Sequence, residues 1–204
     1  MIAEGSLLIT IAIIGAGPLG RWLALAAARA GFRVFLEDVM PSNLHHAQEY
    51  LRQQLTPPSA ELAEGAAFVR PTSQPGESDT TINSVIFVST VEDAVREADL
   101  VMDCVPDELE SKLEILWLLD RMAPPKTVFA TPTTALAITD LAACTYRPEK
   151  CIAIAADPRA LSTQSPGSPI QLQTTTRTTP EAAALVESFW RRLGFYPSIQ
   201  QVSG

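Results

Sequence analysis

The sequence predicts an α/β fold in a single domain, built on a doubly wound, mainly parallel sheet. Short, continuously apolar runs alternate along the chain with amphipathic, helix-like stretches. Continuous apolar strands are typical of sheets that are buried on both faces, and strand–helix alternation is typical of parallel sheets. The length of 204 residues is that of one domain with its own core. We therefore expect residues 1–204 to form one domain.

The individual elements follow from the same pattern. The predicted strands are 9–14, 33–36, 85–88, 100–105, 127–130, 151–155, 170–176 and 196–202. The predicted helices are 18–30, 42–55, 91–97, 108–122, 138–143 and 180–193. Gly31 suits the position after a helix C-terminus, Ser42 or Asn43 suits the cap of the second helix, and Thr90 suits the cap of the third.

The segment 56–84 does not fit this alternation. It contains several prolines and glycines among scattered acids: Pro57, Pro58, Gly65, Pro71, Pro75 and Gly76. Such a composition predicts a surface excursion between the second helix and the third strand. A connection this long is either functional or mobile.

Composition and charge exclude several classes of function. The chain is 47% hydrophobic and 19% charged, with a net charge of −8, which argues against nucleic acid or an anionic membrane as partner. The apolar run 6–14 has no basic residue before it and is too short to span a bilayer. The cysteines Cys104, Cys144 and Cys151 have no metal-ligand spacing, so we expect no metal, reduced thiols and a cytoplasmic location.

A glycine motif follows the first predicted strand directly. Gly15, Gly17 and Gly20 stand in GxGxxG spacing, and Pro18 and Leu19 open the next helix. In this context the first glycine permits a tight turn, the second lets the backbone approach a pyrophosphate, and the third lets the helix pack on the strand. The helix N-terminus then offers free N–H groups to phosphates. The motif predicts a Rossmann-type, dinucleotide-binding domain.

The second predicted strand is followed by an acid at the position that selects the dinucleotide. Asp38 lies 18 residues after Gly20 (38 − 20), near the spacing of about 20 expected for a ribose-binding acid. A carboxylate there accepts hydrogen bonds from ribose hydroxyls and repels a 2′-phosphate. Arg33 lies too early on the strand to bind that phosphate. The expected cofactor is therefore NAD rather than NADP.

Beyond this motif, the chain resembles the NAD-binding domain of the 3-hydroxyacyl-CoA dehydrogenase family from about Ile9 to Gly204, apart from the segment 56–84. The resemblance is carried by GAGPLG, VFLED, ADLVMDCVPDELESKLEIL, ATPTTALAITDLA, RPEKCIAIAADP and GFYPSIQQVSG. It implies that Cys104, Val105 and Pro106 line the nicotinamide ribose and that Lys112 reaches toward the cofactor, with a solvated helix charge as the alternative for Lys112. It also implies an oxidoreductase of fatty acid metabolism.

The chain departs from the family at the catalytic groups. The family places a histidine base at the end of the sixth strand, where this chain has Ala155 and Ala156, and a glutamate near Gln171 and Leu172, where no acid stands. The remaining candidates for proton transfer are few: Thr131, Thr133, Thr134 and Asp157. Asp157, followed by a proline, also suits a turn. His45 and His46 fall on the second helix and are expected at the surface.

The family's helical C-terminal domain would follow Gly204, and we expect it to be absent from this chain. Three functions remain open. The chain is an NAD(H)-binding relative with little or no activity on 3-hydroxyacyl-CoA; or an active oxidoreductase on another substrate or with a partner subunit; or a non-catalytic interaction protein on a relic fold. A homo-oligomer is a further possibility.

Overall fold

A computed structural model describes residues 8–55 and 84–203, and in this part the strands form one sheet of eight. Their order is β3-β2-β1-β4-β5-β6-β7-β8. The strands are β1 Thr10–Ile14, β2 Arg33–Glu37, β3 Val85–Val88, β4 Leu100–Asp103, β5 Val128–Thr133, β6 Cys151–Ala155, β7 Pro169–Thr175 and β8 Tyr196–Val202. The strands β1 to β6 pair in parallel, β7 runs antiparallel to β6, and β8 is parallel to β7. The predicted doubly wound, mainly parallel sheet is confirmed.

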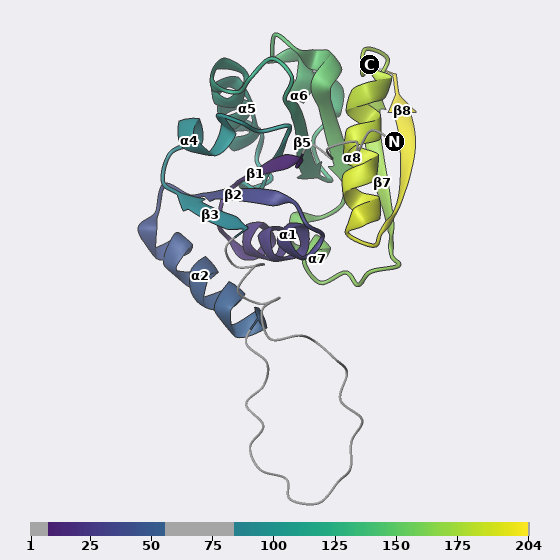
Figure 1. Ribbon diagram of the computed structural model, residues 1–204. Helices are drawn as coiled ribbons and strands as arrows, with labels where there is room; N and C mark the ends of the chain where they lie inside the picture. The colour runs from purple at the N-terminus through teal and green to yellow at the C-terminus, as the bar shows by residue number, and fades with distance from the viewer. Residues whose placement is uncertain (1–7, 56–83, 204) are drawn as a thin grey trace, which may run out of the picture.

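Helices cover both faces of this sheet (Figure 1). They are α1 Pro18–Arg29, α2 Pro41–Leu55, α4 Val91–Val95, α5 Leu109–Met122, α6 Ile138–Ala143, α7 Pro158–Leu161 and α8 Pro180–Arg192, with a 3₁₀ turn η1 at Pro148–Lys150. One buried apolar cluster joins the sheet to α1, α2, α7 and α8, and a second joins it to α4, α5 and α6. The strand β1 contributes alternate residues to both clusters because successive side chains point to opposite faces.

Helix ends test the predicted caps. Gly31 follows α1 with φ of +79°, as expected after a helix C-terminus. The Thr90 side chain accepts a hydrogen bond from the Asp93 N–H and caps α4. The cap predicted at Ser42 or Asn43 is wrong: α2 already begins at Pro41, because proline fits the first helical turn. The short elements η1 and α7 were not predicted, since four residues or fewer give no periodicity.

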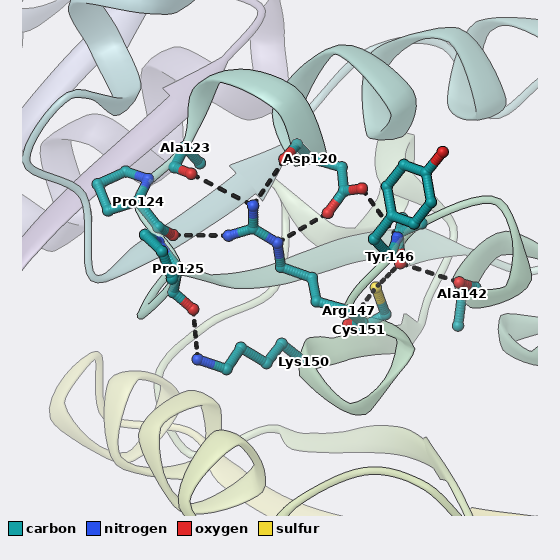
Figure 2. A network of polar contacts seen from close by, with 10 residues as sticks. Asp120, Ala123, Pro124, Pro125, Ala142, Tyr146, Arg147, Lys150 and Cys151 are labelled. Carbon is teal, nitrogen blue, oxygen red and sulfur yellow. Dashed lines mark hydrogen bonds and ion pairs between the residues drawn. The ribbon is translucent and has the colours of Figure 1, made fainter.

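A partly buried arginine, Arg147, fixes the end of α5 to the segment before β6 (Figure 2). The guanidinium of Arg147 donates to the Asp120 side chain and to backbone carbonyls at the end of α5. The Asp120 carboxylate also accepts from the Tyr146 N–H. One side chain thereby satisfies carbonyls that a helix C-terminus leaves without partners. This Arg147 network lies at the amino ends of β5 and β6.

The excursion predicted at 56–84 lies outside the described residues except for Ser84. The predicted surface position of His45 and His46 is confirmed, since both are exposed on α2. No helix in the described part is long and apolar enough to cross a membrane.

Candidate functional site

The glycine loop between β1 and α1 is held by close backbone contacts at its two ends. Gly15 has φ of +101°, and a Cβ there would lie 3.1 Å from the Cys104 carbonyl oxygen. A Cβ at Gly20 would lie 1.8 Å from the Gly15 carbonyl oxygen. Both positions therefore require glycine for the loop to close on the sheet.

Gly17 has the opposite environment. It is the N-cap of α1 with φ of −65°, which any residue can adopt, and a Cβ there would meet no atom of residues 8–55 or 84–203 within 4 Å. Nothing in the fold itself requires glycine at this position. The space that the missing side chain leaves lies at a helix N-terminus whose first turn contains Pro18 and no acid. Such a terminus attracts a phosphate because its N–H groups have no partner within the helix.

Asp38, the predicted ribose acid, lies beside this loop and is 8% exposed. Its carboxylate accepts hydrogen bonds from the Ala16 N–H at 2.9 Å, the Met40 N–H at 2.8 Å and the Asn43 side chain at 3.0 Å. A carboxylate has about four acceptor sites. Ribose hydroxyls would therefore use the remaining site and compete with Asn43 for another.

A second polar cluster is buried at the end of β4, and we call it the Asp103 cluster. The Lys112 Nζ lies 3.0 Å from the Asp103 Oδ2, and both side chains are at most 1% exposed. Asp103 also accepts from the Thr131 hydroxyl at 2.8 Å and from the Val105 N–H at 3.0 Å. The alternative of a solvated Lys112 is wrong, because α5 turns this residue toward the sheet.

The ammonium of Lys112 has no hydrogen bond of good geometry to any described residue, although it forms the ion pair. An ammonium carries three donors, so two or more of them lack a partner in this part of the chain. The cluster fixes the turn after β4, which contains Cys104, Val105 and Pro106. The backbone N–H of Cys104 donates to Ile14 at the end of β1, which places this turn next to the glycine loop.

The end of β6 carries no strong base. Ala155 pairs with Thr133 of β5 in the sheet. Asp157 is exposed and caps α7 through a 2.8 Å hydrogen bond from the Arg159 N–H, which is the turn role suggested by its sequence. On β7, Gln171 is exposed and Leu172 is fully buried.

The threonine candidates differ in accessibility. Thr131 is buried and its hydroxyl is committed to Asp103. Thr133 is buried and its hydroxyl oxygen accepts from the Leu136 N–H at 3.1 Å. Thr134 is exposed, and its backbone N–H donates to Asp107. The structure brings these threonines to the edge between β4 and β6 but gives none of their hydroxyls a base other than Asp103.

Three residues near the cofactor loop were not expected from the sequence: Glu37, Asn43 and Asp103. Glu37 is 2% exposed, and burial, followed by the neighbouring charge of Asp38, raises its pKa from 4.5 to about 7. A charged residue at the end of an otherwise apolar strand, in VFLE and in LVMD, is the signal that would have found Glu37 and Asp103.

The thiols do not take part in this site as nucleophiles. All three cysteines are free. Burial raises the pKa of the Cys151 thiol to about 12 and raises the pKa of Cys104 further from its ordinary value. Both therefore stay protonated at neutral pH. Within residues 8–55 and 84–203, no group of three His, Cys, Asp or Glu side chains is placed to hold a metal ion.

A cavity of about 320 Å³ lies elsewhere, between the C-terminal turn of α1 and that of α8. Its lining includes Trp22, Arg29, Arg192 and Phe195 and no residue of the glycine loop. A 12-residue helix is roughly 18 Å long, so α1 separates this cavity from the loop.

Comparison with known proteins agrees with this geometry. The model of the 3-hydroxyacyl-CoA dehydrogenase NAD-binding domain matches residues 10–155. A probable 3-hydroxybutyryl-CoA dehydrogenase of Bacillus subtilis is 34% identical over 142 residues, which are 70% of this chain and 46% of that protein. The 5-formyl-3-hydroxy-2-methylpyridine 4-carboxylate 5-dehydrogenase of Mesorhizobium japonicum is 26% identical over 93% of this chain and 56% of that protein.

Among solved structures, a diketoreductase superimposes with a TM-score of 0.76 at 26% identity, covering 95% of this chain and 64% of that one. The chain spans about half the length of the curated relatives it matches. The fold, the glycine loop and the match to the family model together define a dinucleotide-binding domain of the dehydrogenase class. The chain belongs to the 3-hydroxyacyl-CoA dehydrogenase family, as its NAD-binding domain, and its cofactor is NAD.

Proposed function

We propose that the dinucleotide lies across the carboxyl ends of β1, β2 and β4. Gly15, Gly17, Pro18, Leu19 and Gly20 hold the pyrophosphate at the start of α1. The observation that carries this placement is the open space at Gly17, beside a helix N-terminus without an acid.

In the same placement, Asp38 accepts from the adenosine ribose, and the turn of Cys104, Val105 and Pro106 lines the nicotinamide side. Lys112 stabilises this turn indirectly, because it pairs with Asp103, whose carboxylate accepts a hydrogen bond from the Val105 N–H. When bound, NAD supplies a hydride acceptor or donor. The chain's own residues orient it at the edge of the sheet.

Replacing Gly17 by valine should weaken NADH binding roughly tenfold or more, because the side chain fills the space of the pyrophosphate. The fold should persist, since the backbone there is extended and no atom lies within 4 Å of a Cβ. Calorimetric titration with NADH, alongside thermal unfolding, measures both effects. The matched contrast is Gly20→Ala, which should destabilise the fold because of its 1.8 Å contact. Unchanged NADH affinity in Gly17→Val would remove the loop from the binding site.

We further propose that the chain has little or no activity on 3-hydroxyacyl-CoA. The support is the end of β6, where Ala155 stands at the family's histidine position and Asp157 serves as a helix cap. A positioned base contributes about 10²- to 10⁴-fold to such a reaction. Neither Gln171 nor Leu172 supplies the carboxylate that orients that base.

Introducing histidine at Ala155 alone should leave acetoacetyl-CoA reduction by NADH within about tenfold of the unchanged protein, because an unoriented imidazole gives little of the full effect. Continuing the register of β6 with β7 by one residue places Gln171 opposite Ala155. The double variant Ala155→His with Gln171→Glu therefore tests orientation separately. A gain of a hundredfold from the single change would show that the histidine was the one missing group.

An active oxidoreductase on a different substrate is the second candidate. The Asp103 cluster favours it, because a buried Lys–Asp pair with a threonine hydroxyl is retained at the cofactor edge. Relatives named for a pyridine carboxylate and for dicarbonyl compounds show that the family's chemistry is not limited to acyl-CoA. A partner subunit or a second copy would then complete the substrate site. We place the protein in the cytoplasm, because its free thiols favour a reducing compartment. For the first candidate, the NAD-binding relative with little activity on 3-hydroxyacyl-CoA, we propose a role in fatty acid metabolism.

A further inference from the structure

Glu37 occupies an apolar slot at the cofactor edge of the sheet. It is the last residue of β2, and its register partners are Ile14 of β1 and Val88 of β3. Side-chain alternation puts Glu37 on the same face as Phe35, within the cluster that α4 and α5 cover. Its Oε1 is buried and has no hydrogen-bond partner among the described residues. A buried acceptor or donor without a partner is costly, so this carboxyl requires an explanation.

In the part of the chain that the structure describes, the buried charges nearest to this carboxyl in the sheet are Asp38 beside it and the Asp103–Lys112 ion pair, whose Asp103 is the register partner of Ile14. Asp38 is the neighbouring charge that acts on it, and together with burial it raises the pKa of Glu37 to about 7. The flanking strands contribute the apolar Ile14 and Val88. On α4, Glu92 and Asp93 are exposed, and Asp93 pairs with Arg96.

The histidines of α2 do not face Glu37. The buried residues of α2, Ala47 and Leu51, pack in the cluster on the opposite face of the sheet. His45 and His46 themselves are exposed.

A carboxyl in its protonated form offers one O–H donor and one carbonyl acceptor. The adenine base has the complementary groups, a ring nitrogen acceptor beside an amino donor. Asp38 is the proposed ribose contact, and consecutive Cα atoms are about 3.8 Å apart. Because the base is bonded directly to that ribose, the proposed placement brings the adenosine end of the cofactor to the end of β2, where Glu37 is the last residue.

We propose that Glu37 contacts the adenosine end of the cofactor and does so only while its carboxyl is protonated, so that cofactor affinity in this chain depends on pH. The proposal rests on the proposed cofactor placement. A charged Glu37 would face Asp38 and the pyrophosphate with the same sign, whereas a neutral one gives its unpartnered oxygen a partner. Glu37 is therefore proposed as a contact whose contribution to cofactor affinity depends on pH.

The test is calorimetric titration of the purified chain with NADH and with ADP-ribose at pH 6, 7 and 8. If only the protonated form binds well, the dissociation constant rises about tenfold from pH 6 to pH 8. ADP-ribose must show the same rise, because it contains the adenosine end without nicotinamide. The variant Glu37→Gln keeps a donor and an acceptor without a titrating proton, so its dissociation constant should change less than about twofold over this range. The control Glu92→Gln removes an exposed acid nearby and should keep the full slope.

The outcomes separate this inference from the cofactor placement itself. A slope that persists in Glu37→Gln assigns the pH effect to a group other than Glu37 and overturns the inference, as does a flat profile in the unchanged protein. If neither NADH nor ADP-ribose binds at any pH, the proposed function fails first. If both bind with a slope that disappears only in Glu37→Gln, both proposals stand.

Discussion

Replacing Lys112 by methionine is expected to lower the free energy of unfolding by about 4 kcal/mol, the cost of leaving one member of a buried ion pair without its partner. Asp103 would keep its bonds from Thr131 and Val105 but lose its counter-charge in a site that is 1% exposed. Urea unfolding at neutral pH measures the change. A loss below about 1 kcal/mol would mean that Asp103 is effectively solvated or takes up a proton without cost.

Two further variants test whether the loss of stability comes from isolating a buried charge. Lys126 pairs with Asp99 at the surface, with side chains 58% and 28% exposed, so Lys126→Met should cost less than about 1 kcal/mol. In an Asp103→Leu background, Lys112→Met should cost much less than in the unchanged protein, because the charge that it would isolate has already been removed. Equal costs in both backgrounds would show that the lysine acts through packing alone.

Replacing Glu37 by valine is expected to raise the free energy of unfolding by about 3 kcal/mol at pH 8 and by less than about 1 kcal/mol at pH 5. The pKa of Glu37 is about 7 in the folded chain and 4.5 as the ordinary value, a difference worth about 1.4 kcal/mol per unit. Below pH 4.5 both states hold the proton. As pH rises to about 7 the unfolded state releases it first, so the glutamate progressively destabilises the fold, and above pH 7 the penalty is constant.

Chemical denaturation of the two proteins at both pH values measures this difference, and subtraction cancels the other titrating groups. Valine suits the slot because its neighbours Ile14 and Val88 are apolar. Glu92→Val, at an exposed site on α4, should show no such dependence on pH. An equal gain at pH 5 and pH 8 would assign the effect to packing and contradict the buried charge.

The sequence predicted the sheet and the glycine loop because each has a local signature, and the role of Asp38 at the ribose stays a prediction. Apolar runs gave the strands, and the spacing of Gly15, Gly17 and Gly20 after the first of them gave the loop. The burial of Lys112 could not be predicted in this way. Apolar residues lie on several sides of it along α5, so their spacing does not show whether the lysine faces the sheet or the solvent. Its burial depends on Asp103, which reaches it only when β4 and α5 have packed.

Other features depend on contacts between distant segments in the same way. Asn43 was predicted as a possible helix cap, but its side chain serves Asp38 instead. The antiparallel pairing of β7 with β6 has no signal in either strand's own residues. The glycine motif and Asp38 predicted the cofactor, and the family resemblance predicted which dehydrogenase family the domain belongs to. The resemblance gave no reason to expect that the Glu37 side chain would be buried.

The Arg147 network has a consequence for how the domain opens and closes locally. It joins the end of α5 and the segment before β6 through one guanidinium, so neither segment can detach without exposing several carbonyls and the Asp120 carboxylate together. We therefore expect the two segments to open together as one cooperative unit. The amino ends of β5 and β6 are thereby tied together by contacts that are separate from the glycine loop at the carboxyl end of β1.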